Sequence, residues 1–137
     1  MPGLLQTEAY ARHLFSGGRQ IGREEVEQHV EARMQRQRIL DRDESPTYLA
    51  LVDEGVLRRR IGRAESMLEQ LDHLIESTRR PTVAIQVVDP ECVAGLAGAF
   101  MIAEFARGEP DAVHADSPVQ GHITTDCDHV SAIWKRY

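Results

Sequence analysis

A strand, a helix and a second strand follow one another between residues 47 and 88, and this order constrains the fold most strongly. Residues 47–53 form a short, nearly continuous apolar run that is typical of a buried strand, and residues 82–88 are rich in β-branched side chains. The helix expected over residues 63–79 has one apolar face made of Ala64, Met67, Leu68, Leu71, Leu74 and Ile75. This succession favours two parallel strands joined by a right-handed crossover.

The remaining sequence predicts helices before this unit and strands after it. The pattern predicts helices over residues 7–15 and 24–40, strands over 99–105, 112–116 and 120–125, and a last helix over 128–134. Short connections between the later strands favour antiparallel pairing. We therefore predict an α+β fold: N-terminal helices, then a mixed or mostly antiparallel sheet carrying the long amphipathic helix, and a truncated C-terminal helix. A length of 137 residues favours a single domain, residues 1–137.

Composition excludes several classes of protein. Apolar residues make up 42% of the chain and charged residues 28%, which is ordinary for a soluble globular protein. No apolar run approaches the roughly 20 residues of a membrane span, and no basic-then-apolar leader is present. Two cysteines, Cys92 and Cys127, make no disulfide framework. We expect a cytoplasmic protein without membrane association.

The charge of the chain argues against nucleic-acid binding by this segment alone. The net charge is −6, and residues 81–137 carry 3 Arg and Lys against 8 Asp and Glu, a balance of −5. Since DNA binding draws on cations that neutralise phosphates, an acidic chain is repelled. The cations are 15 Arg and one Lys, which indicates a gene from a high-GC genome.

Two polar residues, Arg33 and Gln37, interrupt the apolar stripe of the helix expected over residues 24–40. In one interpretation they line a pocket for an anionic or polar ligand, or for the carboxylate of a partner peptide, because the Arg fork suits such groups. In the other, Arg33 pairs with Asp53 or Glu54 and Gln37 holds backbone, since an unpaired buried Arg is costly. We favour the second interpretation and keep the first as a hypothesis.

Asp53 and Glu54 resemble a pair of carboxylates fit for acid–base catalysis. Adjacent residues at the end of a strand point in different directions, however, so a cap for the following turn or short helix, paired with a nearby Arg, is favoured. Next along the chain lies the basic cluster Arg58–Arg60 with Arg63. Its arginines are either an auxiliary phosphate contact or a solvated face balanced by neighbouring glutamates.

The C-terminal part invites a metal interpretation because it gathers the common ligand types. These are His114, Asp116, His122, Asp126, Cys127, Asp128 and His129. Structural zinc sites use short spacings such as C-x₂₋₄-C, and Cys127-x-His129 is one residue too tight. We therefore predict no metal site. The sequence also contains neither G-x-S-x-G nor H-E-x-x-H, and we predict no cofactor and no enzymatic activity.

An ordered set of motifs carries a family resemblance over roughly residues 2–116. The motifs are Pro2-Gly3-Leu4-Leu5-Gln6-Thr7, Tyr10-Ala11-Arg12, Val30-x-x-Arg33-x-x-Arg36-Gln37, Asp53-Glu54-x-Val56-Leu57-Arg58-Arg59, Met67-x-x-Gln70-Leu71-x-x-Leu74, Pro81-x-Val83-x-Ile85-Gln86-Val87 and Gly98-x-Phe100-x-Ile102-x-x-Phe105. Together they resemble the C-terminal domain, itself of unknown function, of actinobacterial Xre-type (WhiJ-like) transcriptional regulators. The similarity thins from Val113 onward.

The resemblance implies a regulatory domain whose DNA-binding helix-turn-helix precedes this chain and is absent from it. It implies DNA contact only through that missing domain, a small protein partner encoded nearby, and a homodimer. The candidate ligand- or partner-binding residues are Gln6, Arg33, Gln37, Asp53, Glu54 and Arg58. A small-ligand sensor of the same regulator is the alternative function, and an enzyme a more distant one. Residues 2–7 are expected to join head and body, as a strut or as part of a switch.

Overall fold

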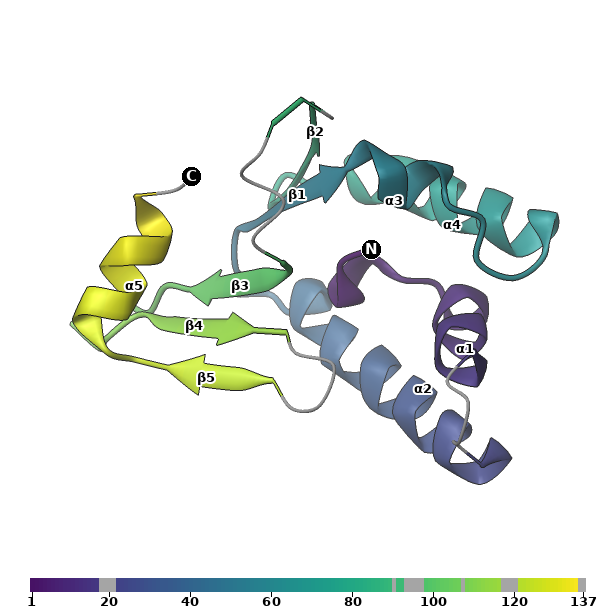
Figure 1. Cartoon of the computed structure of the whole chain (residues 1–137), viewed down its shortest axis with the longest axis horizontal. Helices are drawn as coiled ribbons and strands as arrows, with labels where there is room; N and C mark the ends of the chain where they lie inside the picture. The colour runs from purple at the N-terminus through teal and green to yellow at the C-terminus, as the bar shows by residue number, and fades with distance from the viewer. Residues whose placement is uncertain (18–21, 90, 93–97, 107, 117–120, 136–137) are drawn as a thin grey trace. The chain divides into compact units, whose positions relative to one another are not determined.

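The computed structural model describes all residues except 18–21, 90, 93–97, 107, 117–120 and 136–137 (Figure 1). The chain divides into two compact units, Met1–Pro90 and Glu91–Tyr137, which we describe separately. Helices come first in the chain, two small sheets follow, and a short helix comes last, so the predicted α+β class is confirmed.

The first unit holds most of the helices and one sheet. Its elements are α1 (Glu8–Ser16), α2 (Arg23–Gln37), β1 (Tyr48–Asp53), α3 (Glu54–Arg58), α4 (Ala64–Ser77) and β2 (Val83–Val88). Two short 3-10 helices, Gly3–Leu5 and Arg38–Asp41, precede α1 and extend α2. The boundaries differ from the sequence prediction by a few residues at most, apart from α2, which gives way to the 3-10 helix before Leu40.

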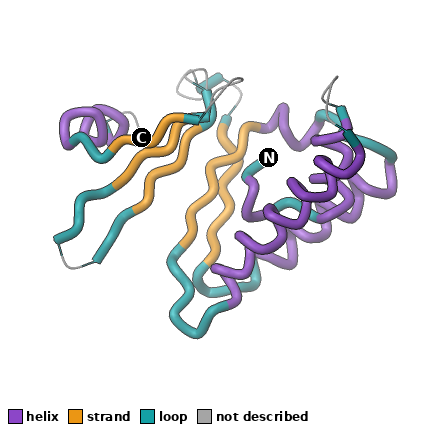
Figure 2. The backbone as a smooth tube through the Cα atoms, turned by 90° about the horizontal axis from the view of Figure 1, so that it is seen from below, coloured by secondary structure: helices purple, strands orange, loops and turns teal. Residues whose placement is uncertain are grey.

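The predicted crossover is present. Strands β1 and β2 pair in parallel, with Tyr48 opposite Val83 and Asp53 opposite Val88, and α3 and α4 lie between them in the chain. The helices of this unit cover one face of the pair (Figure 2). Burial along β1 alternates accordingly, with Ala50 and Val52 inward while Leu49 and Leu51 remain 54% and 42% exposed.

The main core lies between this sheet and the helices. It consists of Leu5, Leu40, Ala50, Val52, Leu74 and Val83. A smaller cluster of Ala11, Val26 and Val30 joins α1 to α2, with Phe15 and Met34 at its edge. Leu5 precedes α1 in the chain and yet is a member of the main core. The first residues therefore pack in the core and do not fray.

Local contacts fix how α1 begins and how it meets α4. The Thr7 hydroxyl accepts a hydrogen bond from the Tyr10 amide at 3.2 Å, which makes Thr7 the N-cap of α1. His13 of α1 lies 3.3 Å from the hydroxyl of Ser66 in α4. Gly62 approaches the same imidazole with a φ of +73°, and a Cβ there would overlap the ring. A glycine is therefore required before α4 both for its φ and for the space it leaves.

The second unit is an antiparallel sheet with one helix. Its elements are β3 (Phe100–Ala103), β4 (Ala112–Ala115), β5 (His122–Thr124) and α5 (Cys127–Trp134). Strand β4 is central, with Val113 opposite both Ile102 and Thr124. Asp126 caps α5 by accepting from the Asp128 and His129 amides at 3.1 and 3.0 Å, and these hydrogen bonds lower the pKa of its carboxyl.

The described strands form two sheets where the sequence predicted one. Strands β1 and β2 pair with each other across the α3–α4 crossover, while β3, β4 and β5 pair with their chain neighbours. The physical reason is connection length, since short links place consecutive antiparallel strands side by side, whereas the parallel pair needs a helical crossover. Each sheet therefore consists of strands that follow one another in the chain.

Candidate functional site

Three of the predicted candidates meet around the first seven residues, which we call the N-terminal segment (residues 1–7). The Gln37 side chain of α2 donates to the carbonyls of Gly3 and Gln6 at 2.9 and 2.7 Å. The Gln6 side chain donates to the Met1 carbonyl at 2.8 Å and accepts from Arg33 Nη1 at 3.2 Å. The prediction that Gln37 holds backbone is therefore confirmed, and Gln6 and Arg33 belong to the same network.

A fourth residue, Gln70 of α4, completes this network from the opposite side. Its Oε1 accepts from the Thr7 amide at 2.8 Å, and its Nε2 donates to the Leu5 carbonyl at 2.6 Å. Gln70 is 0% exposed, so the side chain has no contact with solvent. Sequence reasoning did not single it out as a site residue. The signal was present, because Met67, Gln70 and Leu74 follow the spacing of one buried helix face.

The N-terminal segment thus lies between α2 and α4 and is bound by side chains of both, as the position of the N-terminus in Figure 1 also shows. Leu5, Gln6 and Thr7 are all buried. Buried backbone amides and carbonyls need partners, and here glutamine side chains supply some of them, beside the bonds within the 3-10 helix Gly3–Leu5. Chemically, the site is a set of side-chain amides that bind the backbone of the chain's own first residues.

Arg33 is enclosed by more than Gln6. Its guanidinium lies over the Phe15 ring, with the central carbon 5.2 Å from the ring centroid, and His29 stacks on Phe15 at 5.3 Å. A Cβ at Gly3 would overlap the guanidinium, so the segment passes closely over Arg33. Arg33 is therefore held by a cation–π contact and by the N-terminal segment.

The other three candidates form a separate, local set at the start of α3. The Asp53 carboxylate accepts from the Gly55 amide at 2.7 Å, and Glu54 forms an ion pair with Arg58 one turn later. This confirms the sequence prediction of a helix cap with a nearby Arg as partner. Arg33 contacts Gln6, whereas Asp53 and Glu54 are engaged at the start of α3, and the expected pairing of Arg33 with either carboxylate is not among the ion pairs seen between described residues.

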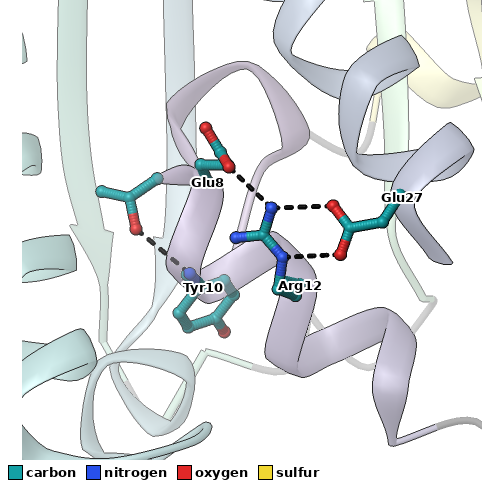
Figure 3. Close-up of polar contacts among 5 residues, drawn as sticks. Glu8, Tyr10, Arg12 and Glu27 are labelled. Atoms are coloured by element: carbon teal, nitrogen blue, oxygen red, sulfur yellow. Dashed lines mark hydrogen bonds and ion pairs between the residues drawn. The ribbon is translucent and has the colours of Figure 1, made fainter. Parts of the chain in front are cut away.

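An ion-paired cluster joins α1 to α2 on the surface (Figure 3). Arg12 donates to the two carboxylate oxygens of Glu27 at 2.9 and 2.8 Å and to Glu8 at 2.6 Å. The hydrogen bond from Arg12 lowers the pKa of the Glu27 carboxyl and raises that of the guanidinium. The cluster is exposed, so its contribution to stability is small, and it orients the two helices.

A buried tyrosine, Tyr10, and a half-buried one, Tyr48, give the first unit a defined response to alkali. Burial raises the pKa of the Tyr10 hydroxyl, against a smaller opposing effect of Arg59, and burial also raises the pKa of Tyr48. An unfolded tyrosine ionises near pH 10. Stability is therefore intact below about pH 10 and falls as the pH rises through the folded pKa values, because the unfolded state releases protons first.

Urea unfolding at pH 8 and pH 11 measures this loss of stability, and we expect the loss to be smaller in Tyr10→Phe. An equal loss in both proteins would contradict the assignment to Tyr10.

The remaining sequence hypotheses concern metals, ligands and membranes. The described residues contain no group of three potential metal-ligating side chains, and the nearest approaches are pairs, His114 with Asp116 and His129 with Asp126. Of two shallow hollows on the described surface, one is lined by Leu40, Asp41, Arg42, Asp43, Ser45, Arg80, Pro81 and Thr82, and the other by Ala32, Gln35, Arg36, Ile39 and Arg42. Neither lining includes Arg33 or Gln37. Among the described helices, none is both long and apolar enough to cross a membrane.

Comparison with known proteins places this geometry in a family. A family model described as a domain of unknown function, DUF5753, matches residues 1–137. No curated protein and no solved structure matches the chain significantly. The matched residues include the N-terminal segment and the glutamines that bind it.

Proposed function

The chain belongs to this family, a domain of unknown function, and we propose that it serves as the regulatory, partner-binding domain of a helix-turn-helix transcriptional regulator. The resemblance of residues 2–116 to the C-terminal domains of Xre-type regulators supports the proposal. The observation that carries it is the burial of the N-terminal segment. A DNA-binding head that precedes residue 2 would be joined directly to the core through Leu5, Gln6 and Thr7.

The proposal assigns different roles to two domains. A helix-turn-helix domain that precedes residue 2, the head, contacts DNA in the cytoplasm of an actinobacterium. This chain, the body, binds a small protein partner and dimerises. Two features of the chain support a binding role. Asp53 and Glu54 are engaged locally, Asp53 as the cap of α3 and Glu54 as the partner of Arg58, and the described hollows are shallow. Its sheet also leaves Leu49 and Leu51 exposed, as a contact surface would.

The gene that encodes this chain provides the decisive test. We expect the natural reading frame upstream of Pro2 to encode a helix-turn-helix domain, because residues 2–7 correspond to the junction of head and body. Sequencing that region reads the result directly. A reading frame without any helix-turn-helix would refute the proposal.

The chain alone is expected to bind duplex DNA negligibly at physiological salt. Its net charge is −6, and DNA affinity near 0.15 M salt depends on cations that displace counterions from phosphates. A gel-shift titration with a mixed-sequence duplex measures this. The same titration with the protein extended by its upstream domain is the comparison, and there we expect binding. Tight binding by the chain alone would contradict the assignment of DNA contact to the head.

A further inference from the structure

The N-terminal segment is bound as a docked peptide would be. Gln37 and Gln70, from helices that are distant in the sequence, contribute four hydrogen bonds to backbone atoms of residues 3–7. These bonds involve only backbone atoms of the segment, so they depend on its backbone conformation and not on the side chains it carries. The segment is thus the element that ties α2 to α4.

The Gln70 contact is the most specific of the four. One amide group satisfies the carbonyl of Leu5 and the amide of Thr7 together, as a neighbouring strand would. The side chain of Leu5, whose carbonyl accepts one of these bonds, is 1% exposed and packs in the main core with Val52 and Leu74. The segment cannot leave Gln70 without removing Leu5 from that core.

We infer that the N-terminal segment is a rigid strut, a docked peptide that opens only together with the main core and that Gln70 connects to α4. Residues 1–7, α2 and α4 then move as one body. The inference goes beyond the proposed function and holds for the chain by itself, whatever precedes or binds it. Its failure would therefore be distinguishable from the failure of that proposal.

Native-state hydrogen exchange of the unmodified chain tests the strut. The reporters are the amide of Thr7, which donates to Gln70, and the amide of Leu74, a core residue in the C-terminal half of α4. Amides that open in one cooperative unit have the same opening free energy. We expect the two protection factors to agree within about tenfold. Exchange at Thr7 that is more than tenfold faster relative to Leu74 would mean that the segment releases alone, and would overturn the inference.

A variant of Gln70 provides an independent measurement. Gln70→Met keeps the length of the side chain but removes both hydrogen bonds, including the acceptor of the Thr7 amide. The reporter in this variant is therefore the Leu5 amide, which donates to the Pro2 carbonyl at 3.1 Å. We expect the protection of Leu5 and Leu74 to fall by the same factor, at least tenfold, and a loss confined to Leu5 would overturn the strut. Gln28→Met, at an exposed position of α2, is the matched control and should leave both protection factors unchanged. If Gln70→Met does not fold, the comparison in the unmodified chain still decides.

Discussion

Gln70→Glu is expected to make the free energy of unfolding of this protein depend on pH, with a larger loss of stability at pH 8 than at pH 5. At neutral pH the introduced carboxylate still accepts from the Thr7 amide but no longer donates to the Leu5 carbonyl. When protonated, a carboxyl group makes both bonds. Gln70 is fully buried, and burial raises the pKa of a carboxyl by up to about 3–5 units. We expect a loss of about 3 kcal/mol at pH 8 relative to the parent, since each unit of pKa corresponds to about 1.4 kcal/mol.

The direction with pH follows from the raised pKa. An unfolded Glu ionises near pH 4.3, so the stability of the variant is fully present below that pH and is lost as the pH rises through the higher folded value. Urea unfolding measures the free energy of unfolding of the variant and of the parent at pH 5 and pH 8. Because both proteins contain the same other carboxyls, such as Glu27, the difference between them at each pH reports residue 70. Gln28→Glu adds the same charge on an exposed face and should cost little at either pH. If Gln70→Glu lowered the free energy of unfolding equally at the two pH values, the pKa of the introduced carboxyl would not be raised. Residue 70 would then be accessible to water, which contradicts its burial.

Much of the first unit is predictable because its signals are local. The strand–helix–strand order of residues 47–88 produces the parallel pair, and the stripe from Val26 to Leu40 lies inward as its spacing predicts. Arg33 and Gln37 stand out since they interrupt that stripe. Asp53 likewise shows its role as a cap through its place at the end of a strand.

The partners of these polar residues are not predictable from the same signals. Gln37 and Gln70 bind backbone atoms of residues 3–7, and a backbone carbonyl carries no sequence signature. The contacts join residues separated by more than 60 positions in the case of Gln70. Arg33 posed the opposite difficulty, because carboxylates were available in the sequence and the contact seen is to a neutral amide and an aromatic ring.

The second unit was predicted less completely for a different reason. Its strands have three or four residues each, and Val113 and Val130 are the apolar residues buried among those described there. Short elements with so small a core leave little periodicity from which to infer which sheet they join. Antiparallel pairing was predictable from short connections, whereas the separation into a sheet of its own was not.

Leu5→Ala is expected to be among the most destabilising single changes in this chain, although it lies five residues from the start. Leu5 is 1% exposed and packs with Leu40, Ala50, Val52, Leu74 and Val83. Truncation of a buried leucine loses its transfer free energy and leaves a cavity, at a cost of about 2–5 kcal/mol. Surface substitutions near chain ends usually cost under about 0.5 kcal/mol, so the predicted loss marks the segment as core. Equilibrium urea unfolding measures it.

Leu68→Ala provides the matched control, because Leu68 belongs to α4 and is 61% exposed. The two variants remove the same atoms, so their difference in unfolding free energy reports the environment of residue 5 alone. We expect that difference to exceed about 1.5 kcal/mol, the lower bound for full burial of a leucine side chain. Equal stability of the two variants would place Leu5 outside the cooperative core. The segment would then be a flexible extension held by hydrogen bonds alone, and a body of this kind could not fix the position of a domain attached before it.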